Sequence, residues 1–539
     1  MIWKSMKKEP PEVLNRTLWL AVLVFGMLGS VRGLDEGLIA GTTAQVSFEN
    51  QFNLKDPSKS KSQQADELSN ITAMVQIGSV GGALVAMFIQ DKIGRVRCLQ
   101  EMLILWTVGA IIEVTSYTQG QMLAGRCIAG LGIGQSVVVG PAYLAEVAPK
   151  NIRGLCTCVF GGSVYLGIML EYFVNYGTIL HIPSTSRLQW VLPTSIQFIF
   201  AGLLFIGSLF VKESPRWLMK IGKEELALKT LSEIRHLPTD DPYVLREILD
   251  VREQIEREKQ ELSGTNVFSL MKELVSTKAN RYRLFLGVCT QLLAQWSGAN
   301  AVTVYSTQFF SMLGIPSKVD QMMYTAILGV VKFCAAVCCA LFLIDTIGRR
   351  RSLYTGLCVQ FVSMMYLGIY LAIVPASKTN RSPSDTKAGG AAIAAIFLSG
   401  CGWALGWNTI QYLINAEIYT VRHRSLACGI IMVVHFANQY GNSKALPYMR
   451  AGITDHGSMF FFAGVLLLSL AWSWFFLPEV SGRSLESIEK MFSLPWYLIG
   501  RRGHKLVPET LTETEEEDQE SEKGVQVTVE HVEVDQSNK

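Results

Sequence analysis

The stretch Asp91-Lys92-Ile93-Gly94-Arg95-Val96-Arg97 occurs a second time in this chain, as Asp345-Thr346-Ile347-Gly348-Arg349-Arg350-Arg351. A second charged pair repeats in the same order, because Glu146 and Arg153 return as Glu417 and Arg424. Both copies interrupt long apolar runs. Charge this dense cannot lie in hydrocarbon, so each copy marks an aqueous edge of a lipid bilayer. The duplicated pattern of edges predicts a membrane protein with two similar halves.

The composition supports a membrane location. Of the 539 residues, 49% are hydrophobic and 17% are charged, whereas soluble domains carry about 25% charged residues. Apolar runs of about 20 residues recur, and each is long enough to cross about 30 Å of hydrocarbon. We therefore expect an all-α polytopic protein in a lipid bilayer. The net charge of +3 is too small to suggest a nucleic-acid partner.

Twelve transmembrane helices are expected, in two pseudo-symmetric bundles of six. The predicted spans cover residues 18–41, 70–90, 98–118, 121–141, 156–180, 190–211, 283–311, 320–344, 352–374, 388–413, 425–446 and 457–477. The connections 91–97, 148–153, 345–351 and 421–424 are short and basic. The positive-inside rule places these loops, and with them both termini, in the cytoplasm.

The remaining segments are polar. The predicted order is a cytoplasmic N-terminus (1–17), a first bundle (18–211), a cytoplasmic helical linker (212–282), a second bundle (283–477) and a cytoplasmic tail (478–539) that is acidic and disordered from about 505. The linker has too few apolar residues for a core of its own. The 11 cysteines show no Cys-x-x-Cys spacing, so they are expected to be small buried apolar residues and no metal site is expected.

Several motifs are similar to those of a known family. The two Asp-x-x-Gly-Arg clusters resemble the signature loops of the major facilitator superfamily, and three further segments resemble its sugar porter family. These are Gly125-Arg126 followed by Pro141-Ala142-Tyr143-Leu144-Ala145-Glu146, then Glu213-Ser214-Pro215-Arg216-Trp217, then Pro478-Glu479-Val480-Ser481-Gly482-Arg483. The resemblance covers nearly the whole chain apart from the tail. It implies the major facilitator fold, alternating access, the plasma membrane and a monomer, with no cofactor and no enzymatic activity.

The repeated charges are expected to form an inner gate. Gly94 and Gly348 permit a tight turn, and Arg95 and Arg349 can then reach acidic partners through charge-assisted hydrogen bonds that hold and release. The gate, in part implied by the resemblance, comprises Asp91, Gly94, Arg95, Glu146, Arg153, Glu213, Arg216, Asp345, Gly348, Arg349, Glu417, Arg424, Glu479 and Arg483. The alternative is that these charges mark topology alone.

Asp35 lies inside the first predicted span, where a buried charge is expensive, and is therefore a functional candidate. The resemblance implies that Asp35 takes up a driving proton and that Arg126 on the fourth span is its partner. Protonation would break this pair and free the helices to move. Arg32 is suitably spaced for a local pair with Asp35, and Glu36 adds an acid of unknown depth. The alternative is a structural pair that transfers no proton.

The segment Gln295-Trp296-Ser297-Gly298-Ala299-Asn300 resembles the substrate-binding part of the seventh span in sugar porters. Its amides can both donate to and accept from hydroxyl groups. Counting from the gate motifs locates the other cavity positions, where several residues differ from the family, such as Tyr412 in place of Trp. The predicted substrate residues are Gln295, Asn300, Tyr305, Lys332, Tyr412, His435, Asn438 and Gln439.

Lys332 in the eighth span could neutralise a substrate carboxylate, and this helix resembles that of fungal quinate-permease-like transporters. We therefore expect import of a monosaccharide or a sugar acid, of the hexose, galacturonate or quinate type, together with a proton. Lys332 could instead pair with an internal glutamate, and His435 could be a hydrogen-bonded core histidine. A facilitative uniporter and a non-transporting nutrient sensor on the same scaffold remain alternative functions.

Overall fold

The computed structural model describes residue 6 and residues 9–262, 267–343, 348–375, 382–479 and 485–500. Every regular element in these ranges is helical, which is how an apolar chain satisfies its backbone hydrogen bonds within a bilayer. By its internal contacts the chain divides into two units, Met1–Trp472 and Ser473–Lys539. Both predicted bundles, up to Trp472, thus belong to one compact unit.

The first half of this unit contains six helical rods, which correspond to the first six predicted spans. They are α2 with α3 (Arg16–Gly26 and Leu28–Thr42), α5 (Lys61–Ile93), α6 (Arg95–Val114), α7 (Gln119–Val147), α8 (Arg153–His181) and α9 (Leu188–Ser208). Two short elements flank the first rod, η1 (Pro11–Val13) and α4 (Val46–Gln51). Several rods, α5 above all, extend beyond the apolar run that predicted them, because polar residues continue the helix past the hydrocarbon.

The second half also contains six rods. They are α14, α15 and α16 (Lys278–Gln295, Ala299–Val304 and Ser306–Met312), α17 with the π-helical turn η2 (Lys318–Cys338 and Cys339–Leu343), α19 (Arg349–Ile373), α20 with α21 (Pro383–Leu405 and Trp407–Glu417), α22 (Val421–Ile453) and α23 (Asp455–Phe476). Within the described part of the chain, nine helices are long and apolar enough to cross a membrane. The other three predicted spans, on α6, α14–α16 and α22, are also helical but are more charged or are broken.

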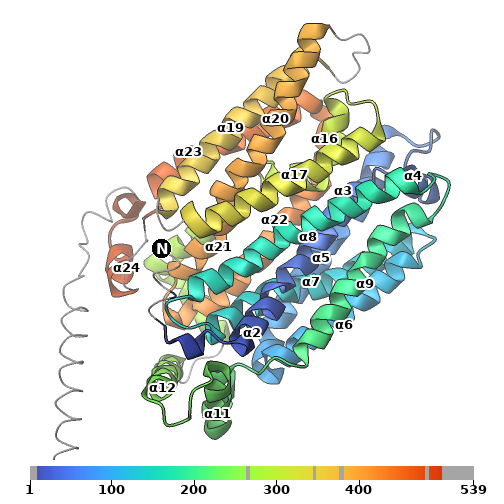
Figure 1. The fold of residues 1–539 in the computed structure, drawn as a ribbon. Helices are drawn as coiled ribbons and strands as arrows, with labels where there is room; N and C mark the ends of the chain where they lie inside the picture. Colours follow the sequence, from blue (N-terminus) through green and yellow to red (C-terminus); the bar gives the residue numbers. More distant parts are fainter. Residues whose placement is uncertain are drawn as a thin grey trace, which may run out of the picture. The chain divides into compact units, whose positions relative to one another are not determined.

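The linker forms α10 (Pro215–Lys220), α11 (Glu224–Arg235), α12 (Pro242–Leu262) and α13 (Val267–Ser276). It differs from the prediction, because its amphipathic helices bury a small apolar cluster of their own. The buried members are Leu218, Met219, Ala227, Leu231, Val244, Ile248 and Ile255. Figure 1 shows α11 and α12 at one end of the first unit and α4 at the other. We call these the inner end and the outer end.

The two halves pack directly on each other. In the first unit α5 contacts α22, α8 contacts α17, and α3 contacts α15 and α16. An apolar cluster crosses the interface, with Tyr165, Ile168 and Tyr172 on α8 packed near Ala326 and Ala336 on α17. This shared packing explains why the halves do not separate into two compact units.

The second unit contains the end of α23 and α24 (Leu485–Phe492). Within it, the rings of Phe476 and Trp496 stack with centroids 6.2 Å apart. The tail from about 505, which the sequence predicts to be disordered, lies outside the described residues.

Candidate functional site

Asp35 and Arg126 form a buried ion pair between α3 and α7. Arg126 Nη2 lies 3.2 Å from Asp35 Oδ2, and the two residues are 1% and 2% exposed. A second carboxylate, on Glu113 of α6, lies 3.9 Å from Arg126 Nη1. One oxygen of each carboxylate has no hydrogen-bond partner. One cation therefore holds two buried acids, an arrangement that is costly in a low dielectric.

Arg32 does not pair with Asp35, although its spacing permits such a pair. Its Nε instead donates to Glu36 Oε1 at 2.8 Å. Its Nη1 donates to the Tyr412 hydroxyl at 3.0 Å, and its Nη2 donates to Gln439 Oε1 at 3.4 Å. Since Tyr412 and Gln439 lie on α21 and α22, Arg32 bonds the first half to the second.

His435 lies at the centre of the predicted substrate residues. Its Nδ1 lies 2.9 Å from Gln291 Oε1 and 3.1 Å from Gln295 Nε2. Its Nε2 lies 3.3 Å from the Tyr412 hydroxyl. The ring therefore joins helices α14, α21 and α22. Gln291, which the sequence analysis did not select, belongs to the same cluster.

The remaining amides extend this cluster. Gln439 Nε2 donates to Asn300 Oδ1 at 3.1 Å and to Glu36 Oε1 at 2.9 Å. Asn438 Oδ1 accepts from Trp296 Nε1 at 3.3 Å. Gln295 Oε1 and Asn300 Nδ2 are buried and have no hydrogen-bond partner. The cluster thus retains a free acceptor and a free donor, which is what a solute with several hydroxyl groups requires.

Two predicted substrate residues have other partners. Lys332 is buried and donates to the hydroxyl of Thr303 on α15, and its charge interacts with that of Glu36. The Tyr305 hydroxyl bonds to Thr72 Oγ1 on α5 at 2.7 Å and to the Ser443 carbonyl at 2.8 Å. Tyr305 therefore takes part in contacts between the halves toward the outer end.

At the inner end, the first copy of the charged motif forms a compact network. Arg95 Nη2 donates to Glu146 at 2.7 Å, and Arg95 Nη1 lies 3.1 Å from Asp91. Glu213 accepts the backbone N–H groups of Arg95 and Val96 at 2.9 and 3.1 Å. Burial raises the pKa of the Glu213 carboxyl, and these backbone donors oppose that shift. The network joins α5, α6 and α7 to the start of the linker.

Gly94 is required at this turn for two reasons. Its φ is +92°, a conformation that residues with a side chain rarely adopt. In addition, a Cβ there would lie 2.5 Å from Glu213 Oε2. Gly348 repeats the conformation with φ of +87°, as the duplicated motif predicts.

Two residues of the predicted gate lie elsewhere. Arg153 is exposed and does not complete the network, because Glu146 Oε2 has no hydrogen-bond partner. Arg216 instead binds Glu258 and donates to Gln254 at 3.0 Å, both on α12. Arg153 begins α8, and Arg216 lies in the first turn of α10. In this conformation Arg216 is bonded to α12 of the linker.

The second copy of the network is described only in part. Arg349 begins α19, and Arg424 Nη2 donates to the Tyr419 carbonyl at 3.2 Å. Asp345, the Glu417 side chain and Arg483 lie outside the described residues. Glu479 follows α23 in the second unit.

The halves are bonded together at the outer end. Lys318 on α17 donates to the Ala44 carbonyl at 2.7 Å and lies 3.1 Å from Glu49. Lys444 and Tyr448 on α22 bond to Asp66 on α5 at 2.6 and 2.7 Å. With the Tyr305 contacts, these bonds close the outer end in this conformation.

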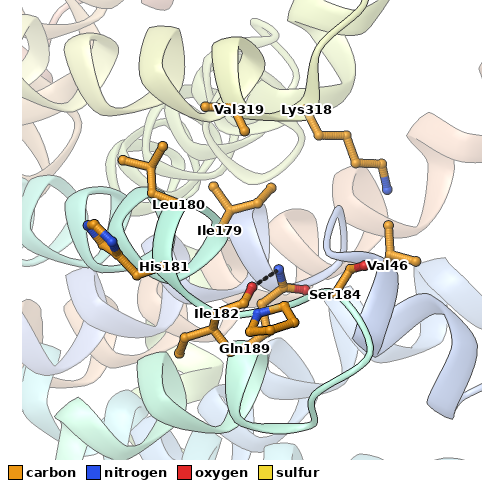
Figure 2. A pocket seen from close by; sticks show the side chains of 10 residues that line it. Val46, Ile179, Leu180, His181, Ile182, Ser184, Gln189, Lys318 and Val319 are labelled. Carbon is orange, nitrogen blue, oxygen red and sulfur yellow. Dashed lines mark hydrogen bonds between the residues drawn. The ribbon is translucent and has the colours of Figure 1, made fainter.

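A cavity of about 470 Å³ lies beside this closure, lined by segments 179–184 and by Val46, Gln189, Lys318 and Val319. Figure 2 shows Gln189 in its wall donating to the Ile182 carbonyl. None of the predicted substrate residues lines it. The buried polar cluster around His435 is therefore the candidate site. Across the described ranges, no group of three or more His, Cys, Asp and Glu residues is arranged to hold a metal.

Comparison with known proteins agrees with this architecture. The family model for sugar (and other) transporters matches residues 21–492. A probable quinate permease of Aspergillus niger is 32% identical, over 90% of each chain, and the quinate permease of Neurospora terricola is 30% identical, over 91% of each chain. The solved xylose transporter XylE of E. coli, in a partially occluded inward open conformation, has a TM-score of 0.71 at 22% identity, covering 87% of this chain and all of that one.

Proposed function

The chain belongs to the sugar (and other) transporter family, and on that premise we propose that it is a proton-coupled symporter. It is a transporter embedded in the membrane and not an enzyme. Its substrate is a monosaccharide or a sugar acid of the hexose, galacturonate or quinate type, which it imports by alternating access. It acts as a monomer in the plasma membrane, with both termini in the cytoplasm.

The observation that carries this proposal is the ion pair between Asp35 and Arg126. The pair is sealed from water, and Glu113 is the second carboxylate beside Arg126, so loss of the charge on Asp35 leaves Arg126 with Glu113 as its partner. Protonation of Asp35 from the outside is such a loss. It frees α3 from α7, and because α3 also contacts α15 and α16 of the other half, the release reaches the substrate cluster.

The cluster around His435 supports a hydroxylated substrate. Gln291, Gln295, Asn300 and Gln439 present amides from α14, α15 and α22, and two of their polar atoms are free. The curated relatives named above are quinate permeases, and quinate carries several hydroxyl groups and one carboxylate. Closure of the halves around such a solute, followed by release of the inner network at Arg95, completes one transport cycle.

The test is uptake of labelled hexoses, pentoses, galacturonate and quinate at acidic and neutral pH by cells that lack their own transporters. Asp35→Asn should abolish accumulation against a gradient while exchange of internal for external substrate continues, because the variant binds substrate but no proton. Asp240→Asn, an exposed substitution in the linker, serves as the control. Retained accumulation in Asp35→Asn would contradict proton coupling at this residue. Absence of uptake by the unchanged protein would favour the sensor.

A further inference from the structure

A positive charge lies among the predicted substrate residues, on Arg32 of α3. Its guanidinium contacts Tyr412 and Gln439, and its charge lies 5.7 Å from the ring centre of Phe436. The side chains of Arg32 and Glu36 are 13% and 10% exposed, whereas those of Arg126 and Asp35 are 1% and 3% exposed. Arg32 and Glu36 are therefore more accessible to a solute than the proposed proton site.

The geometry of α3 separates these two pairs. Successive residues of a helix point about 100° apart, so Asp35 faces α7 while Glu36 faces the second half. Arg32 lies one turn before Glu36 and shares its face. One short helix thus carries a proton site on one side and an ion pair on the other.

The charges on the second side do not balance. Arg32 pairs with Glu36 at 2.8 Å, and Lys332, a second basic residue, donates to the neutral Thr303 hydroxyl rather than to a carboxylate. Asp35 and Glu113 are held by Arg126 on α7, and Glu171 on α8 accepts from Asn175 Nδ2 of the same helix at 3.5 Å. His435 and Arg32 both contact the Tyr412 hydroxyl, at 3.3 and 3.0 Å. One further carboxylate would balance the pair of cations.

We propose that Arg32 is the residue that binds the carboxylate of the substrate, and that Glu36 occupies this position when no substrate is present. The inference rests on the proposed function and narrows it to acidic substrates. An arriving carboxylate takes the guanidinium by charge-assisted hydrogen bonds. The displaced Glu36 keeps the hydrogen bond from Gln439 Nε2, at 2.9 Å, and the charge of Lys332. A neutral polyol has no carboxylate and cannot form these charge-assisted hydrogen bonds with Arg32.

The experiment compares uptake of quinate with uptake of a neutral cyclitol of similar size. The double variant Arg32→Gln/Glu36→Gln removes both members of this ion pair, so neither is left facing an absent partner. It should lower the preference for quinate over the cyclitol by about tenfold or more, because a site built for a charged group discriminates strongly against its loss. Glu36→Gln alone should lower the half-saturation concentration for quinate, because it removes the resident competitor. Arg257→Gln/Glu253→Gln, the same pair with the same spacing on the exposed face of α12, is the matched control.

An unchanged preference in the double variant, or a weaker affinity for quinate in Glu36→Gln, overturns the assignment of Arg32. The Glu36→Gln variant keeps the test decisive if the double variant fails to reach the membrane. Robust uptake of the cyclitol with no uptake of quinate by the unchanged protein overturns this inference but leaves the proposed function standing. No uptake of any solute overturns both.

Discussion

At the residue scale, Arg95 is where the contacts of the inner end converge. Its guanidinium reaches Glu146 and Asp91, and its backbone N–H bonds to Glu213. The side chains of Arg95 and Glu146 are only 7% and 12% exposed. A pair this shielded from water is worth more than a surface ion pair, and each partner left alone is correspondingly costly. A contact of this kind can hold one conformation of a transporter and be lost in another.

Reversing the charges of this pair tests it. Arg95→Glu and Glu146→Arg should each reduce uptake by about tenfold or more, because each leaves two like charges facing each other in a largely buried position. The double reversal should recover only part of the loss, because it restores opposite charges at positions 95 and 146 but places a glutamate beside Asp91. Uptake and surface abundance are measured together. The double reversal of Lys212 and Glu233, an exposed pair, should change little. If the double variant is no better than either single one, the pairing has no role in transport.

At the element scale, the break between α14 and α15 positions the polar cluster around His435. Gly298 has a φ of +88°, and a Cβ there would lie 2.9 Å from Phe462 Cγ. The break lets Gln295 end α14 and places Asn300 in the first turn of α15. In an unbroken helix the side chains of Gln295 and Asn300 would keep ordinary helical spacing and would not both face this cluster. Only a residue without a side chain adopts this turn at Gly298 without backbone strain.

Gly298→Ala should therefore destabilise the protein by about 1–3 kcal/mol, through strain in the left-handed conformation and contact with Phe462. The expected result is a lower unfolding temperature in detergent and weaker substrate binding. Gly464→Ala is the control, because a Cβ at this helical glycine meets nothing within 4 Å. Equal unfolding temperatures for the two variants would contradict the role of this turn.

At the scale of the whole molecule, the two halves are held together at the outer end by polar contacts from several helices. Lys318 joins α17 to Glu49, and Asp66 on α5 accepts from Lys444 and Tyr448 of α22. These bonds join the two halves at the outer end, so separating the halves there would break them. They therefore favour the closed conformation over any conformation open to the outside, in proportion to their net strength.

Asp66→Asn should shift this balance toward the outward-open conformation. The pair with Lys444 is partly exposed, so its loss is worth at most about 1 kcal/mol. The half-saturation concentration for external substrate should fall by about two- to fivefold, because a larger fraction of the molecules is in the outward-open conformation before substrate binds. Asp56→Asn, whose contacts stay within its own loop at Ser58, should leave it unchanged. A rise in the half-saturation concentration would show that Asp66 has the opposite effect.

The sequence by itself determined the fold class and the repeated turns. Apolar runs of membrane length and charged loops are local properties of the chain, so they predicted the helices, and Gly94 and Gly348 adopt the same left-handed turn because the motif demands it locally. Local spacing also suggested two contacts that tertiary structure replaced. Arg32 pairs with Glu36 and the second half rather than with Asp35, and Arg153 stands apart from Glu146. Which of several nearby partners a long charged side chain takes depends on the helices packed against it, and only the assembled bundle decides that.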